Sequence, residues 1–373
     1  MFEARYQQVR VNLLEWFEEN QRALPWRKRY LPYEIWISEI MLQQTQVTTM
    51  LPYYTRWMER FPHLPTVASA PEEELLKYWE GMGYYARARN VHKTAQILLK
   101  EFGAEFPKNY QLLLSLPGIG RYTAGAIMSI AFNADYPAVD GNVARILARL
   151  FDLKKPIQDK ESQNALWGIA RRLLSRGKAR NFNQALMDLG ALICLPRSPL
   201  CLECPVRDIC RGLELGVVSQ RPVVRKARDT IPIHAAVGIL LLEDKIFIQK
   251  RPPSGLMPHL WEFPGGKLQD GESPEDALMR EFIEELGLKI CALRKVALIR
   301  HNYTTFRVTL HAFTCQLEDH DQQPVLRSAV EGRWVTMGEL DLYAFPAANR
   351  KLIRLIQTKP LGSWDRQRCI QSP

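Results

Sequence analysis

Apolar side chains recur at spacings of three and four through the first 210 residues, and prolines and glycines interrupt this pattern at intervals. The spacing is typical of amphipathic helices, and no convincing apolar–polar alternation occurs in this half. From residue 233 the pattern changes to short apolar runs typical of strands, at 235–242, 245–249, 295–300, 307–315 and 333–335. The sequence therefore predicts a multi-domain chain, an all-α domain followed by an α+β domain.

A stretch rich in proline, valine and basic residues separates the two patterns. We interpret residues 211–232 as an extended interdomain linker, suited to crossing a DNA backbone. The predicted organisation is an all-α domain over 1–210, this linker, an α+β domain over 233–360 and a C-terminal tail over 361–373.

Composition narrows the function classes. A chain of 373 residues is long enough for about two domains, and its net charge of +10 favours a polyanionic partner. No run of eighteen or more apolar residues occurs, so we expect no membrane partner. Residues 1–20 predict an amphipathic helix rather than a signal peptide. Seven cysteines, four of them clustered, favour metal ligation in a reducing compartment, so we expect an intracellular protein.

Residues 116–124, Leu-Pro-Gly-Ile-Gly-Arg-Tyr-Thr-Ala, lie between two apolar runs with helical spacing. They predict two helices joined by a tight turn at Gly118 and Gly120. Glycines allow a close backbone approach, and the amides that open the second helix, near Arg121, attract a phosphate. We interpret the segment as a hairpin that binds a nucleic-acid backbone; the alternative is an ordinary turn between two helices.

Two carboxyl groups are candidate catalytic residues. Glu39 lies among isoleucines, a tryptophan and a methionine, and such surroundings keep a carboxyl protonated, as a general acid requires. Asp140 directly precedes a predicted helix, where it suits an N-cap and where helix amides favour its ionised form. A protonated and an ionised carboxyl are the pair needed to break a glycosidic bond. The alternatives are a solvated glutamate and a purely structural cap.

Two further segments are candidates for contact with stacked bases. Gln43, Gln44 and Gln46 follow the helix that carries Glu39, and their amides suit a gap in a base stack, although ordinary surface residues are the alternative. Residues 81–90 alternate aromatic side chains with arginines after a glycine turn, including Tyr84 and Arg87. Aromatic rings can enter a base stack while arginines bind phosphates, although core packing explains the same pattern.

Two clusters suggest metal sites. Cys194, Cys201, Cys204 and Cys210 form a C-x6-C-x2-C-x5-C pattern, and four thiolates in a short loop bind either zinc or an iron–sulfur cluster. The spacing alone does not separate these two. In the second domain three glutamates share one face of a predicted helix and suit Mg²⁺ holding a diphosphate; the alternative is a charged solvent face, against which Arg280 and the glycine loop argue. The three glutamates are Glu281, Glu284 and Glu285.

These motifs together resemble a known family. Ser-Glu-Ile-Met-Leu-Gln-Gln-Thr-Gln-Val around Glu39, the Leu-Pro-Gly-Ile-Gly hairpin, Asp140 and the cysteine loop resemble the helix-hairpin-helix DNA glycosylases. Leu-Pro-Trp-Arg at 24–27, Gly-Tyr-Tyr at 83–85 and Val-Asp-Gly-Asn-Val at 139–143 resemble the adenine DNA glycosylase (MutY) family in particular. The second half resembles the Nudix domain of that family.

The resemblance implies a monofunctional enzyme that excises adenine mispaired with 8-oxoguanine or guanine in double-stranded DNA. Glu39 would protonate adenine N7, and Asp140, supported by Tyr122 and Asn142, would stabilise the oxocarbenium ion. The endonuclease III type has a lysine where this chain has Tyr122, and this difference argues against strong lyase activity. The four cysteines would hold a [4Fe–4S] cluster, and we expect a monomer in the cytoplasm or nucleoid.

The resemblance also assigns contacts with DNA. Trp26 and Arg27 would line the adenine pocket, and Gln44 and Tyr84 would wedge the base stack. The loop that reads the lesion is usually Phe-Ser-His in the family, whereas this chain has Tyr303, Thr304 and Thr305. The exchange of histidine for Thr305 bears on the preference for 8-oxoguanine.

Three rival functions follow from the same motifs. They are an endonuclease III-like glycosylase/lyase for oxidised pyrimidines, a catalytically inactive mismatch-binding protein, and a nucleotide pyrophosphatase with a DNA-binding appendage. Tyr122 and the Nudix-like half argue against the first, and intact Glu39 and Asp140 against the second. The complete Nudix pattern, G-x5-E-x7-R-E-U-x-E-E-x-G-U, keeps pyrophosphatase activity with Mg²⁺ as a hypothesis.

Overall fold

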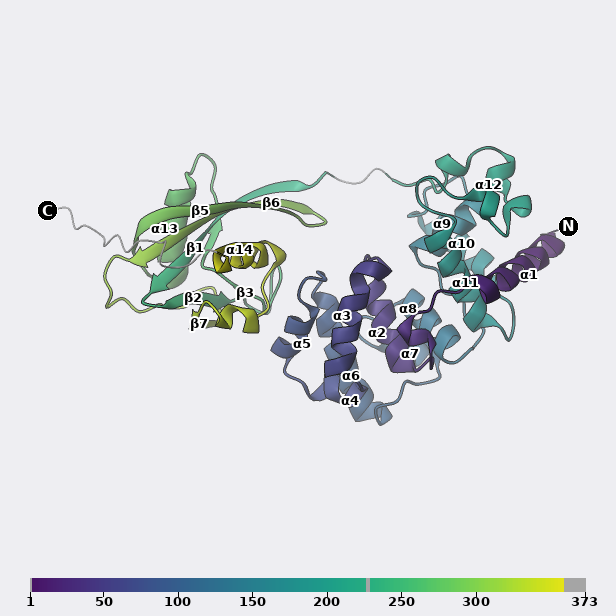
Figure 1. Ribbon diagram of the computed structural model, residues 1–373, viewed down its shortest axis with the longest axis horizontal. Coiled ribbons are helices and arrows are strands. Elements are labelled where there is room, and N and C mark those ends of the chain that lie inside the picture. The colour runs from purple at the N-terminus through teal and green to yellow at the C-terminus, as the bar shows by residue number, and fades with distance from the viewer. Residues whose placement is uncertain (1, 226–228, 359–373) are drawn as a thin grey trace. The chain divides into compact units, whose positions relative to one another are not determined.

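The computed structural model describes residues 2–225 and 229–358 (Figure 1), so the predicted tail at 361–373 lies outside the described residues. The chain divides into two compact units. Unit 1 comprises Met1–Ala70 and Arg89–Ala227, and unit 2 comprises Pro71–Ala88 and Arg228–Pro373.

The regular elements among the described residues of unit 1 are all helical, as the apolar spacing predicted. Its α-helices are α1 (Phe2–Asn20), α2 (Pro32–Leu42), α3 (Val47–Arg60), α4 (Leu64–Ser69), most of α6 (Ala86–Phe102), α7 (Tyr110–Ser115), α8 (Arg121–Ala126), α9 (Gly141–Leu150), α10 (Lys160–Leu173), α11 (Ala179–Leu192) and α12 (Arg211–Glu214). Short helical turns add η1 (Pro25–Arg27), the π-helical η2 (Ile127–Ala131), η3 (Cys201–Glu203), η4 (Arg207–Ile209) and η5 (Val218–Gln220).

The predicted helix-hairpin-helix is formed by α7 and α8. The Asn109 side chain caps α7 by accepting hydrogen bonds from two backbone amides, and the chain then turns at 116–120. Gly118 takes a left-handed φ of +75°, and a Cβ there would lie only 2.7 Å from Cβ of Asn90 on α6. The Thr94 hydroxyl, also on α6, donates to the carbonyl of Pro117. The turn therefore needs glycine at 118 to pack against α6.

Unit 2 is built around a mixed sheet. Its strands are β1 (Ile231–Leu242), β2 (Lys245–Lys250), β3 (Trp261–Glu262), β4 (Gly265–Lys267), β5 (Ile290–Asn302), β6 (Phe306–Leu317) and β7 (Glu331–Thr336). The order is β3-β2-β1-β6-β5, with β4 paired to β1 and β7 to β2. β1 and β6 run parallel from the Ile231–Phe306 pair to the Leu240–Cys315 pair. The predicted strands are all present, and β3 and β4 are two short strands that the pattern did not predict.

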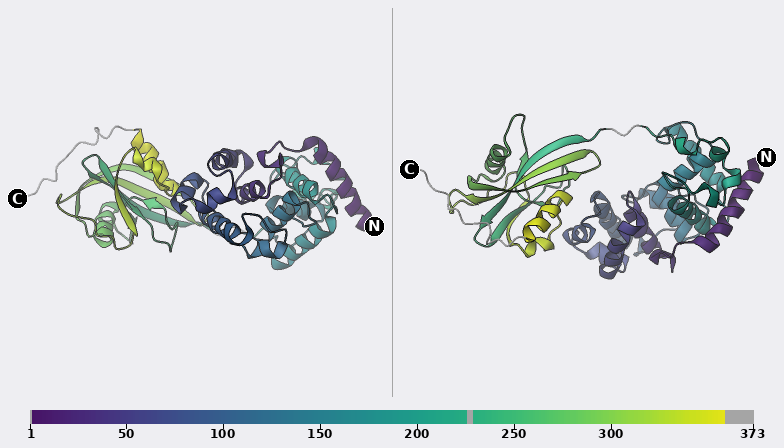
Figure 2. Two further views of the ribbon diagram at one scale, coloured as in Figure 1. Left: turned by 90° about the horizontal axis from the view of Figure 1, so that it is seen from below. Right: turned by 45° about the horizontal axis from the view of Figure 1, so that its top comes forward.

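Helices cover both faces of this sheet (Figures 1 and 2). α13 (Pro274–Leu286) buries Leu278 and Phe282 in one apolar core, and α14 (Ala347–Gln357) buries Leu352 and Ile353 in another. η6 (Glu339–Leu342) precedes α14. Unit 2 is therefore an α+β layer structure, as the sequence predicted.

The unit boundaries differ from the predicted domains at residues 71–88. This segment contains α5 (Glu72–Trp79) and groups with unit 2. Trp261 Nε1 donates to Glu73 on α5, and Glu80 accepts from the backbone amide of Phe345 and from Arg350. These contacts join positions that are far apart in sequence, so periodicity gave no indication of them.

The predicted linker is also different, because residues 211–225 pack on unit 1 instead of extending freely. Arg221 pairs with Asp152 at 2.8 Å, and Arg225 pairs with Asp159 at 2.7 Å. The backbone amide of Ile157 donates to the carbonyl of Val223. In residues 2–225 and 229–358 no helix is both long and apolar enough to cross a membrane.

Candidate active site

Glu39 is a buried carboxyl on α2. The helix begins at Pro32, and a run of apolar residues makes almost all of it buried. Glu39 is only 3% exposed, and the Tyr122 hydroxyl on α8 donates a hydrogen bond to Glu39 Oε2. We expected Tyr122 to support Asp140, so its hydrogen bond to Glu39 is a difference from that expectation. It arises because α2 packs directly against α8.

Asp140 caps α9, as the position before a predicted helix indicated. Its Oδ1 accepts from the backbone amide of Val143 at 2.7 Å, and its Oδ2 accepts from Asn142 Nδ2 at 3.2 Å. Arg145 holds Asn142 in turn, through a 2.8 Å hydrogen bond from Nη2 to Asn142 Oδ1. Asp140 thus has two direct donors, and the expected support from Asn142 is present.

The two carboxyls interact electrostatically. Burial raises the pKa of Glu39 to about 7; the Tyr122 hydrogen bond and the Arg27 charge oppose this rise, and the Asp140 charge adds to it. Burial also raises the pKa of Asp140 above its ordinary value, against the opposing effects of Val143, Arg145 and Asn142. The Val143 and Asn142 hydrogen bonds act in the expected direction, since they lower this pKa, and the effect of burial on it is larger.

Arg27 and Trp26 lie on η1, which packs against α2. Trp26 is 3% exposed and meets the Tyr54 ring edge-on at 5.0 Å. The Arg27 side chain is 7% exposed and binds Asp188 on α11, with Nη1–Oδ2 at 2.7 Å and Nη2–Oδ1 at 2.9 Å. Both residues are therefore held by other parts of unit 1.

The hairpin glycines have different surroundings. Gly118 is packed on α6, whereas a Cβ at Gly120 would meet nothing within 4 Å, and Gly120 has an ordinary φ of −88°. The exposed Arg121 follows, and its guanidinium lies 3.9 Å from the centre of the Trp167 ring. The close approach that we expected both glycines to allow is thus an internal one at Gly118, while Gly120 is open.

The predicted wedge residues are exposed. Gln44 lies in the turn after α2 with a positive φ of 58°. Tyr84 in unit 2 is 44% exposed and also has a positive φ, 50°. The Arg87 guanidinium lies 5.4 Å from the centres of both the Trp79 and Tyr84 rings.

The predicted lesion-reading residues form the hairpin loop between β5 and β6. Thr304 and Thr305 are exposed, and the Tyr303 hydroxyl accepts from the backbone amide of Ala348. The Thr304 hydroxyl is hydrogen-bonded to the hydroxyl of Tyr84. Unit 2 therefore brings together a predicted wedge residue and the predicted reading loop.

The three Nudix glutamates lie on α13, but other side chains engage them. Arg280 donates at 2.9 Å to both Glu281 and Glu284, and it also binds Glu272. Glu285 accepts from Gln249 and Ser328. A Mg²⁺ ion there would compete with Arg280, and the Mg²⁺ site stays a prediction.

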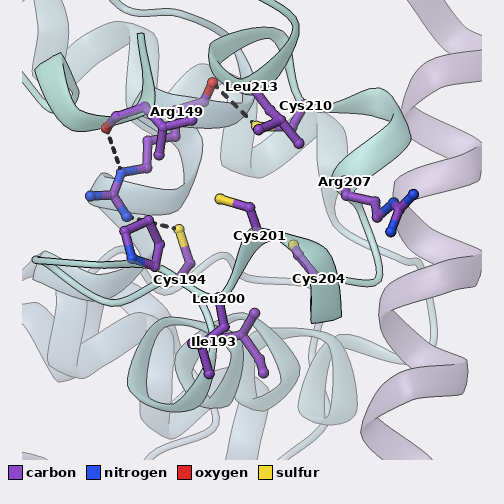
Figure 3. A pocket seen from close by; sticks show the side chains of 11 residues that line it. Arg149, Ile193, Cys194, Leu200, Cys201, Cys204, Arg207, Cys210 and Leu213 are labelled. Atoms are coloured by element: carbon purple, nitrogen blue, oxygen red, sulfur yellow. Dashed lines mark hydrogen bonds between the residues drawn. The ribbon is translucent and has the colours of Figure 1, made fainter. Parts of the chain in front are cut away.

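The four clustered cysteines line one cavity with about 310 Å³ of empty volume, part of it open to solvent (Figure 3). Arg149 borders it and donates to Cys194 Sγ at 3.3 Å. Burial, with repulsion from the other three cysteines, raises the pKa of Cys204 to about 12, so this set of thiols needs a cation before it ionises together.

The donor set fits an iron–sulfur cluster better than a single ion. Zinc needs four sulfurs at about 2.3 Å from one centre. Among the described residues, no three His, Cys, Asp or Glu side chains are grouped closely enough to hold one metal ion. An iron–sulfur cluster is larger and distributes its thiolate ligands over several iron atoms. A cavity lined by four separated thiols suits that arrangement.

Two residues that position the site side chains, Arg145 and Asp188, were not predicted from the sequence. Arg145 links Asn142 to the carbonyls of Gly190 and Cys194, at 2.7 and 2.8 Å, so hydrogen bonds connect Asp140 with the cysteine loop. Asp188, which holds Arg27, is fully buried among apolar neighbours on α11. A charged residue inside an apolar helical run was the available signal, because buried charges are almost always paired.

Comparisons with known proteins agree with this geometry. The family model of the HhH-GPD superfamily base excision DNA repair protein matches residues 37–172, a NUDIX domain model matches 236–355, and the iron-sulfur binding domain of endonuclease III matches 194–210. The adenine DNA glycosylase of Homo sapiens is 34% identical over 95% of this chain and 75% of that protein. The adenine DNA glycosylase of Buchnera aphidicola subsp. Baizongia pistaciae is 40% identical over 68% of this chain and 72% of that protein.

A solved structure of a thermostable thymine-DNA glycosylase also matches, with a TM-score of 0.53 and 30% identity, over 57% of this chain and 98% of that chain. The helix-hairpin-helix fold, the carboxyl pair of Glu39 and Asp140 and the cysteine loop thus define a base-excision DNA glycosylase with an iron–sulfur binding loop and a Nudix domain. Within that class, the chain belongs to the adenine DNA glycosylase family, whose members are hydrolases acting on N-glycosidic bonds.

Proposed function

We propose that this protein is a monofunctional DNA glycosylase that removes adenine mispaired with 8-oxoguanine or guanine. The observation that carries the proposal is that two interacting carboxyls, the buried Glu39 and the partly buried Asp140, have different hydrogen-bonding environments. Glu39 has one hydrogen-bond donor and a pKa near 7, whereas Asp140 has two donors and the nearby charge of Arg145. Glu39 is therefore the proton donor and Asp140 the carboxylate.

Glu39 gives its proton to N7 of the flipped adenine. The C1′–N9 bond then breaks, its electron pair leaves with the base, and positive charge develops on the deoxyribose. The ionised Asp140 stabilises that oxocarbenium ion, and water adds at C1′ and loses a proton, so the products are adenine and an abasic site. Tyr122 and Asn142 keep the two carboxyls in place through their hydrogen bonds.

The remaining predicted residues serve duplex binding. The hairpin at 116–120, with the exposed Arg121, binds the phosphate backbone through amides and charge. Gln44 and Tyr84 enter the stack from which adenine is flipped. The exposed Thr304 and Thr305 read the opposite base, and the hydroxyl of Thr304 supplies a hydrogen bond to it. Double-stranded DNA is thus the partner, and the protein acts as a monomer inside the cell.

The cofactor is a [4Fe–4S] cluster held by Cys194, Cys201, Cys204 and Cys210. When bound, it supplies the positive charge that lets four thiolates approach one another, and it cross-links the loop. The chain's own contribution is the Arg149 side chain, which binds Cys194 Sγ and the carbonyls of Leu195 and Pro196.

The test is single-turnover base release from matched duplexes bearing adenine opposite 8-oxoguanine, adenine opposite guanine, and thymine glycol opposite adenine. The proposal predicts release of adenine, with the strand intact until alkali is added. The ratio of the first two rates measures what Tyr303, Thr304 and Thr305 do to lesion preference. Cleavage only at thymine glycol would support the endonuclease III-like alternative, and no release from any duplex would refute the proposal.

A further inference from the structure

Asp188 is a fully buried carboxylate that forms an ion-paired cluster with two arginines. Arg22 binds it with Nη2–Oδ1 at 2.6 Å and also through its backbone amide, and Arg27 binds both carboxylate oxygens. Arg27 Nη1 additionally donates to the carbonyl of Arg22 at 3.2 Å. The segment that carries both arginines is therefore tied to α11 at a single carboxylate.

The Arg27 guanidinium is held rigidly in one orientation. Asp188 meets its two terminal nitrogens end-on, and the Phe17 ring lies on its face, 5.5 Å from the guanidinium carbon. This arrangement leaves the Nε–H edge of Arg27 without a contact to Asp188 or Phe17. Arg27 Nε is buried, and it has no hydrogen-bond partner among the described residues. A buried, unpaired guanidinium donor points to a ligand acceptor, and purine ring nitrogens are acceptors of that kind.

The cluster also lies beside the reacting groups. η1, which carries Arg27, packs against α2, which carries Glu39. Two residues after Asp188, Gly190 packs so closely on Asn142 that a Cβ would lie 2.6 Å from Asn142 Cβ. The same turn of α11 therefore supports Arg27 on the Glu39 side and Asn142 on the Asp140 side.

We infer that Asp188 is a positioning residue for base release: it fixes Arg27 so that its free Nε–H edge binds the flipped purine beside Glu39. The inference rests on the proposed adenine excision. Asp188 touches neither DNA nor the reacting atoms, so it acts entirely through Arg27. Its removal therefore slows the chemical step while duplex binding is preserved.

The experiment compares Asp188→Asn, Arg27→Met and the double variant in the full-length, cluster-loaded protein, using single-turnover adenine release and duplex affinity. We expect Asp188→Asn to slow release roughly 10- to 100-fold, because misplacing a positioning group costs about that much. Duplex affinity should stay within about threefold, and the double variant should release adenine no more slowly than Arg27→Met alone.

The matched control is Asp152→Asn, which removes an aspartate carboxylate whose side chain is 8% exposed and pairs with Arg221 elsewhere in unit 1. It should lower stability without changing the rate of release. A merely structural role for Asp188 would make the two aspartate variants alike. That result would overturn the inference. So would a double variant in which the rate losses of Asp188→Asn and Arg27→Met multiply.

A second variant covers the case in which Asp188→Asn does not fold. Arg27→Lys keeps the charge but cannot pair end-on with Asp188 or offer an Nε–H edge. It should release adenine slowly, and a wild-type rate would contradict the inference. The wild-type protein distinguishes the proposed function from the proposed role of Asp188, because its failure to release adenine from any duplex would refute the proposed function itself.

Discussion

Glu39 is buried and Asp140 is partly buried, and the two carboxyls also differ in their hydrogen bonds. A carboxylate that accepts backbone and amide donors is stabilised in its ionised form, whereas one with a single phenolic donor is less so. Asp140 accepts from the amide of Val143 and the side chain of Asn142, and Glu39 accepts from the Tyr122 hydroxyl. These contacts support the proposed roles of Glu39 as the acid and Asp140 as the carboxylate.

The pH dependence of base release follows from this assignment. Glu39 must be protonated, and burial raises its pKa to about 7, so single-turnover release should fall as the pH rises through neutrality. Asp140 must be ionised, and burial raises its pKa as well, so release should also fall in acid, at a higher pH than for an ordinary aspartate. Rates over a series of buffers on both sides of neutrality test both limbs, with duplex binding measured at each pH as the control. A rate that increases through neutrality would contradict the assignment.

At this scale the sequence predicted the candidate carboxyls but not all of their partners. The apolar neighbours of Glu39 and the N-cap position of Asp140 are local features of the chain. The bond from Tyr122 to Glu39 and the pairing of Arg27 with Asp188 depend on how distant helices pack, and 161 residues separate the latter two positions. No local pattern specifies such pairs.

Among the elements, the turn between α7 and α8 contains two glycines, Gly118 and Gly120, with different surroundings. Gly118 has a left-handed φ and no room for a Cβ, while Gly120 has an ordinary φ and open space around it. Gly118 therefore serves the packing of the turn on α6, and Gly120 keeps the turn accessible.

We expect Gly118→Ala to destabilise the protein by about 1–3 kcal/mol, because alanine is strained at positive φ and its Cβ would collide with Asn90. Denaturant unfolding measures this change. Gly120→Ala is the matched control: it should keep the stability and weaken duplex binding, if the open side of the turn approaches the DNA backbone. Equal destabilisation by both substitutions would refute this division of roles.

The classes of the elements could be predicted from the sequence, but some of their contacts could not. Helical spacing and strand runs predicted both fold classes, because burial imposes those periods on the chain. The grouping of α5 with unit 2 rests on contacts such as Trp261 with Glu73, and the packing of residues 211–225 rests on pairs such as Arg221 with Asp152. Prolines and basic residues resembled a free linker because composition does not reveal such partners.

In the whole molecule, the iron–sulfur loop follows α11, which carries Asp188. The loop also contacts α9, whose N-cap is Asp140. Arg145 donates to Asn142 and to the carbonyl of Cys194, so the loop and the carboxyl pair share one hydrogen-bonded support. Loss of the cluster should therefore disturb more than its own loop.

We expect the purified protein to contain iron, to show the visible absorption of thiolate-bound iron, and to lose both in Cys204→Ser. That variant should also unfold at a lower temperature and release adenine more slowly. Metal analysis, absorption spectra and thermal unfolding measure these effects. Cys315→Ser is the control, because Cys315 is a buried cysteine of unit 2, outside the loop. Colourless wild-type protein containing only zinc would contradict the cluster assignment.

Single-turnover adenine release by Glu39→Gln, with duplex affinity determined alongside, tests whether Glu39 is the acid. Glutamine keeps the shape of the side chain but cannot donate the proton, so release should slow roughly 10²- to 10⁴-fold while binding is retained. Glu34→Gln, on the same helix and paired with Arg29, is the matched control and should release adenine at the wild-type rate. A Glu39→Gln protein that releases adenine as fast as the wild type would show that Glu39 is not the acid.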